Sequence, residues 1–212
     1  MCSSDLGLVR ALTGLGDLER GVERTDAAAT AYASARTLAQ QLNDPAADAA
    51  LLVGLADIER TRGGSTAAAL AQQARERANS PAGQASALVL QARIALQAND
   101  LAVAERALAE AQQALGQTDD PVVAQALLAV ADVQRAKGDA GALESYRKAL
   151  AAFEANGTRL GEAWALLGLG KAQGTASPIE AKVNLLLAGN LFAALGMEAR
   201  RAEATAAAAA IN

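Results

Sequence analysis

The sequence repeats itself every 36 to 40 residues, and this period limits the possible folds more than any other feature. Five segments share a bulky residue, a second residue three positions later that is apolar in four of them, and then a small residue. These segments are Leu12-x-x-Leu15-Gly16, Leu52-x-x-Leu55-Ala56, Leu88-x-x-Gln91-Ala92, Leu127-x-x-Val130-Ala131 and Trp164-x-x-Leu167-Gly168. Spacing of i, i+3 and i+4 is typical of a helix with one apolar face. The period therefore predicts stacked helical units, each buried against its neighbours.

Turn-forming residues divide each repeat into two helices. The turns inside the repeats are Arg24-Thr25-Asp26, Gly63-Gly64-Ser65, Asn99-Asp100, Lys137-Gly138-Asp139 and Gly174-Thr175-Ala176-Ser177-Pro178. The turns between repeats are Asn43-Asp44-Pro45, Asn79-Ser80-Pro81, Thr118-Asp119-Asp120-Pro121 and Asn156-Gly157-Thr158. Gly and Asn tolerate the left-handed conformation that ends a helix, Asp and Ser cap the next helix, and Pro fits its first turn. We expect ten helices, with Ser177 as a cap, and an eleventh helix from about Met197 to Ala210.

The composition agrees with helices that pack closely. Alanine accounts for 58 of the 212 residues, whereas aromatic residues make up only 2%. Alanine is the best helix former, and its small side chain lets two helix backbones approach each other. No run of β-branched and aromatic residues of the kind that forms strands is present. These features predict an all-α fold.

Three segments give the pattern a family resemblance. They are Glu162-Ala163-Trp164-Ala165-Leu166-Leu167-Gly168, Gly138-Asp139 followed by Leu143-Glu144-Ser145-Tyr146-Arg147-Lys148-Ala149-Leu150, and Asn99-Asp100 followed by Ala104, Leu108 and Ala111. From about residue 8 onward the chain resembles the tetratricopeptide repeat family, in a bacterial variant whose period exceeds the usual 34 residues. The resemblance implies a right-handed superhelical solenoid of about five antiparallel helix pairs plus a C-terminal helix.

The ends of the chain differ from the repeats. Residues 1–6 resemble a translated sequencing-adapter remnant from a metagenomic fragment, so we interpret them as a non-native tag or a frayed terminus. Residues 7–196 form the expected repeat array, and residues 197–212 form an expected capping helix with Arg200, Arg201 and Glu203 on its polar face. The N-terminal end carries no comparable polar cap, which fits either a truncated chain or self-association at that end.

Residues that most enzymes and metal sites need are missing. The chain has no histidine and a single cysteine, Cys2. A Cys/His zinc site, an internal disulfide and a Ser–His–Asp triad are therefore excluded. Gly14-Leu15-Gly16 and Gly168-Leu169-Gly170-Lys171 lie inside expected helices, not between a strand and a helix as a phosphate loop requires. We expect no catalysis, no metal and no other cofactor.

Charge narrows the class of partner. The net charge is −4 and the isoelectric point is about 5.0, with lysine and arginine dispersed along the chain. A nucleic-acid partner would require clustered basic residues, so a protein or peptide partner is favoured. No apolar run is long enough to insert into a membrane. Composition leaves both the cytoplasm, which we place first, and the periplasm open.

Equivalent positions of the first helices carry alternating charges. One column contains Asp17, Asp57, Arg93 and Asp132, and the column three residues later contains Arg20, Arg60, Leu96 and Arg135. In the family that the chain resembles, these columns line the concave groove. We call Asp17, Arg20, Asp57, Arg60, Arg93, Asp132 and Arg135 the charged row. Val53, Val89 and Leu128 would flank it as an apolar strip.

The charged row has two interpretations. Asp and Arg three residues apart on a helix form weak local ion pairs of about 0.2–0.5 kcal/mol that serve only solubility. Alternatively, the row binds a partner helix or extended segment that carries both charge signs. The second interpretation predicts a protein-interaction scaffold, or else the ligand- or partner-sensing segment of a larger transcriptional regulator or signalling protein.

Overall fold

The computed structural model describes residues 3–211, and the chain is all-α. The described residues form eleven α-helices and one short 3₁₀ turn, without any strand. The first helix already contains residues 3–6, whereas the prediction for Met1 and Cys2 lies outside the described residues. The chain divides into two compact units, Met1–Gln117 and Thr118–Asn212, which are described separately below as unit 1 and unit 2.

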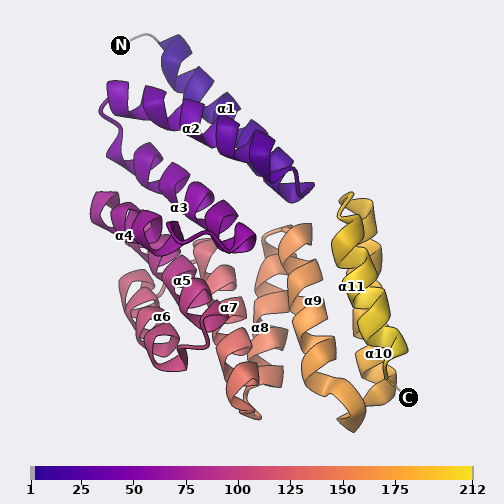
Figure 1. The fold of residues 1–212 in the computed structure, drawn as a ribbon. Coiled ribbons are helices and arrows are strands. Elements are labelled where there is room, and N and C mark those ends of the chain that lie inside the picture. Colours follow the sequence, from indigo (N-terminus) through magenta and orange to yellow (C-terminus); the bar gives the residue numbers. More distant parts are fainter. Residues whose placement is uncertain (1–2, 212) are drawn as a thin grey trace. The chain divides into compact units, whose positions relative to one another are not determined.

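Unit 1 contains six helices joined by short turns. They are α1 (Ser3–Gly21), α2 (Thr25–Gln41), α3 (Pro45–Arg62), α4 (Ala67–Arg77), α5 (Pro81–Gln97) and α6 (Leu101–Leu115). Each helix packs against the next one along the chain (Figure 1). In addition, α3 packs against both α1 and α5, so the odd-numbered helices form one row. The even-numbered helices cover one side of that row.

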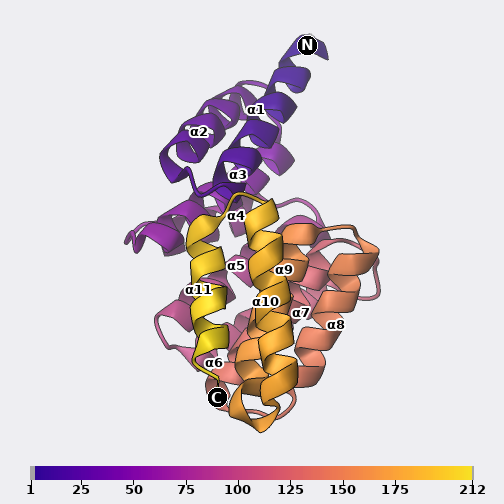
Figure 2. The ribbon, with the colours of Figure 1, turned by 90° about the vertical axis from the view of Figure 1, so that its right-hand side faces the viewer.

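Unit 2 repeats this arrangement. It contains α7 (Val122–Lys137), α8 (Ala142–Ala155), α9 (Arg159–Gln173), the 3₁₀ turn η1 (Gly174–Ala176), α10 (Pro178–Ala194) and α11 (Glu198–Ala209). Consecutive helices pack against each other, and α7 also contacts α9. Figure 2 shows α10 and α11 running side by side toward opposite ends. The helix predicted from about Met197 to Ala210 is α11, and both of its observed ends lie within one residue of the prediction.

Several predicted turn residues adopt the conformations that end and begin helices. The φ angles of Gly63 and Gly138 are 70° and 72°, and those of Asn43 and Asn99 are 54° and 58°. These values lie in the left-handed region, where glycine and asparagine are tolerated best. Side-chain caps follow as predicted: Asp44, Ser80 and Asp100 accept hydrogen bonds from the backbone N–H groups of Ala47, Gly83 and Val103, respectively.

The prediction for Ser177 is wrong. Ser177 occupies the residue before α10, and Pro178 begins that helix as expected, but the serine side chain makes no capping hydrogen bond. The turn η1 brings the chain into Ser177 at φ −138° and ψ 68°. Its backbone carbonyl still accepts from the Ala181 N–H at 2.9 Å, so the helix begins on a backbone hydrogen bond.

The interior of each unit is built from alanine around a few large side chains. All five predicted small residues, Gly16, Ala56, Ala92, Ala131 and Gly168, are buried. The largest fully buried side chains include Tyr32 in unit 1 and Tyr146 and Phe192 in unit 2. Close packing of this kind needs small residues opposite large ones. In the part of the chain that the structure describes, no helix is long and apolar enough to cross a membrane.

The C-terminal helix packs on the last helix pair through one face. Ala204, Ala208 and the following Ile211 join the apolar core that contains Phe192. On the polar side, the Arg200 guanidinium lies 5.1 Å from the centre of the Trp164 ring, a distance at which a cation attracts the ring face. This contact joins α11 to α9.

Candidate partner-binding surface

In unit 1, the charged row converges on one buried carboxylate. Asp57 of α3 is 8% exposed. Arg60 donates to its Oδ1 from Nε at 2.9 Å and from Nη2 at 2.8 Å, and Arg20 of α1 donates to Oδ2 at 3.1 Å. Nη1 of Arg93, on α5, lies 3.7 Å from Oδ1. The carboxylate therefore joins all three odd-numbered helices of the unit.

A tyrosine from the even-numbered helices completes this network. The Tyr32 hydroxyl on α2 donates to Asp17 Oδ1 at 2.6 Å and accepts from Arg20 Nε at 3.2 Å. Its ring fits against two glycines: a Cβ atom added at Gly16 or Gly54 would lie 2.5 or 2.8 Å from ring carbons. Because Gly16 and Gly54 have no Cβ atom, the Tyr32 ring can lie against both of them, and its hydroxyl reaches the charged row.

The environment shifts the pKa values of the central groups. Burial alone would raise the pKa of Asp57, but Arg93, Arg60 and Arg20 outweigh it and lower that pKa to about 2. Burial raises the pKa of Tyr32 to about 12; the hydrogen bond to Asp17 adds to the rise, and Arg20 opposes it. Asp57 is thus a stable anion, and Tyr32 is a stable neutral donor, throughout the physiological pH range.

Exposure separates an inner from an outer part of the network. The side chains of Asp57 and Arg60 are only 11% and 17% exposed. Those of Asp17, Arg20 and Arg93 are 57%, 38% and 38% exposed. Asp57 and Arg60 therefore hold the other charged side chains in place, whereas Asp17, Arg20 and Arg93 are accessible to a partner.

Unit 2 contains a second copy of the aspartate–tyrosine–arginine arrangement. The Tyr146 hydroxyl on α8 donates to Asp132 Oδ1 at 2.5 Å and accepts from Arg135 Nε at 3.0 Å. Burial, followed by the charge of Asp132, raises the pKa of Tyr146 well above its ordinary value. The tyrosine ring again lies over a glycine, because a Cβ atom added at Gly168 would lie 2.2 Å from Cε1.

The expected apolar strip is only partly exposed. Val89 is 3% exposed, because α5 is packed between α3, α4 and α6. Val53 is partly buried against the core formed by Leu52, Ala74 and Ala87, whereas Leu128 is partly buried against the core around Ala131. Val89 is therefore inaccessible to a partner in this conformation. Val53 and Leu128 remain partly exposed, so only Val89 is excluded from the expected strip.

Both interpretations of the charged row find contacts that fit them. Nη2 of Arg20 lies 3.7 Å from Oδ1 of Asp17 on α1, and this exposed pair is the weak local kind of the solubility interpretation. The Asp57–Arg60 pair, at 2.8 Å, is also local but is largely buried. The pairs of Arg20 and Arg93 with Asp57 cross from one helix to another and are not local. The row therefore also fixes the spacing of α1, α3 and α5.

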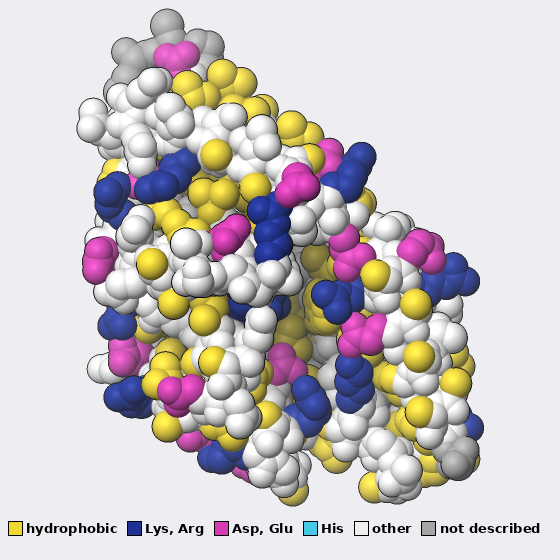
Figure 3. All heavy atoms as spheres, viewed as in Figure 1, with side chains coloured by type: hydrophobic (Ala, Val, Ile, Leu, Met, Phe, Trp, Pro, Cys, Tyr) yellow, Lys and Arg dark blue, Asp and Glu magenta, His cyan; other side chains and the backbone are white. Residues whose placement is uncertain are grey.

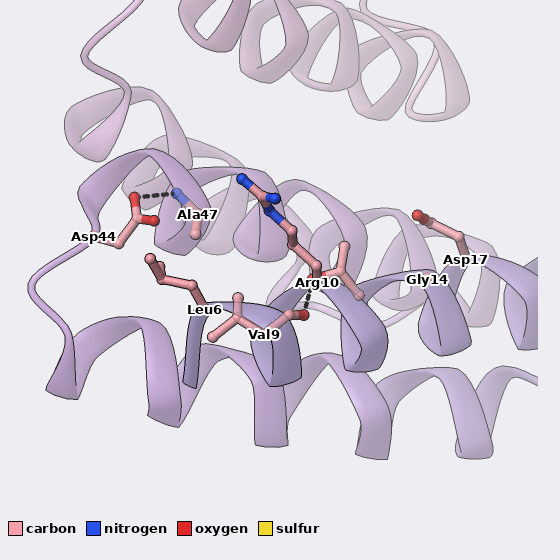
Figure 4. Close-up of a pocket in the computed structure, with 8 residues that line it drawn as sticks. Leu6, Val9, Arg10, Gly14, Asp17, Asp44 and Ala47 are labelled. Carbon is pink, nitrogen blue, oxygen red and sulfur yellow. Dashed lines mark hydrogen bonds between the residues drawn. The ribbon is translucent and has the colours of Figure 1, made fainter. Parts of the chain in front are cut away.

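A shallow pocket lies beside the charged row in unit 1. It opens between α1 and the start of α3, and Figure 4 shows Asp17 at one end and Asp44 at the other. Its remaining lining is Leu6, Val9, Arg10, Thr13, Gly14 and Ala47. On the face in Figure 3, acidic and basic side chains are interspersed without a large area of one sign.

Sequence reasoning missed the two tyrosines and one buried ion cluster. Tyr32 and Tyr146 are the only tyrosines of the chain, and each follows the aspartate that it contacts by 15 or 14 residues. This repeated spacing was the available signal. Asp48 of α3 is 2% exposed; its Oδ1 accepts from Arg36 at 2.7 Å, and its Oδ2 accepts from Arg77. This cluster, which lies outside the charged row, joins α2, α3 and α4.

No protein-family model matches this chain, and no curated protein sequence matches it. The resemblance to the tetratricopeptide repeat family rests on the residues quoted above.

Proposed function

We propose that the chain is a non-catalytic scaffold that binds a partner peptide or helix on the row of odd-numbered helices. The observation that carries this proposal is the network around Asp57, which places three accessible charged side chains on two helices of one packed row. Asp17 and Arg20 lie on α1, and Arg93 lies on α5. A preorganised set of charges across several helices gives a partner a fixed pattern to match.

The charges indicate the chemistry of the partner. In unit 1 the charged row contains three arginines, Arg20, Arg60 and Arg93, and two aspartates, Asp17 and Asp57, which gives 3 − 2 = +1. A segment that offers a carboxylate to Arg20 or Arg93 and a cation to Asp17 matches this pattern. Because the row is nearly neutral overall, we expect binding to weaken only modestly as salt concentration rises.

The same groups are poorly suited to acid–base or nucleophilic chemistry. A general base works best with a pKa near the working pH, whereas the pKa of Asp57 is lowered to about 2. The Tyr32 hydroxyl has a raised pKa and already donates to Asp17, so it is a weak nucleophile. These properties support a role in binding.

We further propose that the helix pairs within each unit are wound as a right-handed superhelix of the tetratricopeptide type. Packing between adjacent helix pairs within each unit and the five buried small residues support this architecture.

Selection from a random-peptide display library tests the binding proposal. We expect enriched peptides to carry both charge signs and to bind the wild-type chain. The substitution Arg93→Glu reverses the charge of an accessible arginine and should weaken binding of these peptides by about tenfold or more, because it removes one ion pair and adds one repulsion.

Arg106→Glu is the matched control. It makes the same charge change at an exposed position of α6, outside the row of odd-numbered helices, and should leave binding unchanged. Both variants must keep the helical signal of the wild type. Peptides that bind the two variants equally well, or a library without enrichment, would refute the proposed surface.

A further inference from the structure

One face of α1 is apolar, and no other part of the described residues buries it. Leu8, Leu15 and Leu18 are 48%, 45% and 71% exposed. They are the exposed large apolar residues of unit 1. Ala11 lies between them and is also exposed. An exposed leucine by itself is ordinary, but three on one helix face form an apolar patch of the kind that marks an interaction site.

The repeat identifies what kind of occupant fits this face. Ala11, Gly14 and Leu18 correspond, 40 residues earlier, to Leu51, Gly54 and Ile58 of α3. Leu51 and Ile58 are 1% exposed and join the core formed with α2, and Gly54 receives the Tyr32 ring of α2. The internal helix α3 therefore packs this same face on another helix. By equivalence, the outer face of α1 is shaped to receive a helix.

The face is complementary to itself when two copies run antiparallel. Gly7, Ala11, Gly14 and Leu18 follow one another at i, i+4, i+7 and i+11, so they form one row along α1. A two-fold axis between residues 12 and 13 places Leu18 of one copy opposite Gly7 of the other, and Ala11 opposite Gly14. A Cβ atom at Gly7 or Gly14 would meet nothing within 4 Å in the single chain. Each glycine thus offers room for a side chain or backbone of the second copy.

The two flanks of the row match under the same axis. Leu8 and Leu15 flank it on one side, so Leu8 of one copy would lie next to Leu15 of the other copy. Arg10 and Asp17 flank it on the opposite side, and the axis brings Arg10 of one copy within two helical positions of Asp17 of the other. Asp17 is 57% exposed, so it can accept an ion pair while it keeps its hydrogen bond from Tyr32.

We propose that two copies of this chain associate through antiparallel packing of α1 on α1. The contact has an apolar centre, one leucine flank and one flank with two symmetry-related Arg10–Asp17 ion pairs. An isologous contact of this kind closes on itself and produces a dimer, whereas a contact between different surfaces would produce open chains. The proposed dimer shares Asp17 with the proposed peptide-binding surface, but Leu18 and Arg10, the two residues substituted to test the dimer, lie outside the charged row.

Sedimentation of the full chain over a range of concentrations tests this proposal. We expect the apparent mass to rise from the 21.4 kDa of one copy toward twice that value. Leu18→Glu should remain monomeric with an unchanged helical signal, because the substituted side chain is mostly exposed in the single chain. Arg10→Asp, which faces Asp17 of the second copy, should weaken the dimer on the order of tenfold, whereas Arg10→Lys should retain it.

Ile179→Glu is the matched control, since Ile179 is an 80% exposed apolar residue of α10. It should leave the dimer unchanged. A wild-type chain that stays monomeric up to its solubility limit would overturn the proposal. So would a dimer that survives Leu18→Glu, or one that is lost with Ile179→Glu instead.

Discussion

Asp57→Asn is the substitution whose effect can be calculated most fully from the structure. The change keeps the size of the side chain and removes the negative charge that Arg20, Arg60 and Arg93 surround. The pKa of Asp57 is lowered from 3.8 to about 2. Each pKa unit corresponds to 1.36 kcal/mol, so at pH 7 the ionised carboxylate stabilises the folded chain by about 2 kcal/mol.

The pH dependence follows from the direction of the shift. Because the folded-state pKa is lowered, the stabilisation is complete above the unfolded-state value of 3.8 and disappears as the pH falls through about 2. The difference in unfolding free energy between the wild type and Asp57→Asn should therefore be about 2 kcal/mol at pH 7. It should fall to about 1 kcal/mol near pH 3, where the unfolded chain already binds the proton.

Urea unfolding followed by circular dichroism at both pH values provides the measurement. Asp119→Asn serves as the control, since Asp119 is exposed in the turn before α7, and it should change the unfolding midpoint at neither pH. An Asp57→Asn variant as stable as the wild type at pH 7 would refute the reasoning. A loss of stability that does not shrink toward pH 3 would show that the carboxylate charge is not its source.

Three further predictions concern the packing and the tyrosines. Gly168→Ala should destabilise the chain by about 1–3 kcal/mol, because the added Cβ would lie 2.2 Å from Tyr146, whereas Gly189→Ala, with its nearest neighbour at 3.7 Å, should be tolerated; equal unfolding midpoints would contradict this. Asp48→Asn should lower the free energy of unfolding by about 1 kcal/mol, because it removes the charge that Arg36 and Arg77 contact, while these arginines, 24% and 52% exposed, still reach water. A stability equal to wild type would contradict the role of that cluster. The pKa values of Tyr32 and Tyr146 are both raised, so tyrosinate absorbance should not appear near pH 10 in the folded chain. The stability that the neutral hydroxyls contribute should hold below pH 10 and fall as the pH rises toward about 12. A tyrosine that titrates near pH 10 while the chain remains folded would contradict the buried hydroxyl contacts.

The fold was largely predictable because its signals are local. The left-handed residues Asn43, Gly63, Asn99 and Gly138 end helices through their own backbone preferences, and Asp44 caps α3 through an adjacent N–H group. Such effects depend on a few consecutive residues, which the sequence shows directly. Ser177 departs from this pattern because the turn η1 before it alters how the chain enters α10.

The candidate surface was only partly predictable because it depends on contacts between helices. The equivalence of Asp17, Asp57 and Arg93 gave the charged row, but no helical periodicity identifies Tyr32 as the residue that binds it from α2. Val89 was misplaced for the same reason. The equivalent residues Thr13, Val53 and Leu128 are partly exposed, yet three surrounding helices bury Val89.

The central claim is that a partner binds the charged row on the odd-numbered helices, and the arginine side chains report on it directly. In a nuclear magnetic resonance titration of the wild-type chain with a selected peptide, the Nε–H signals of Arg20 and Arg93 should shift as the peptide saturates, while that of Arg106 on α6 stays in place. Saturating binding that leaves the Arg20 and Arg93 signals unmoved would contradict the claim.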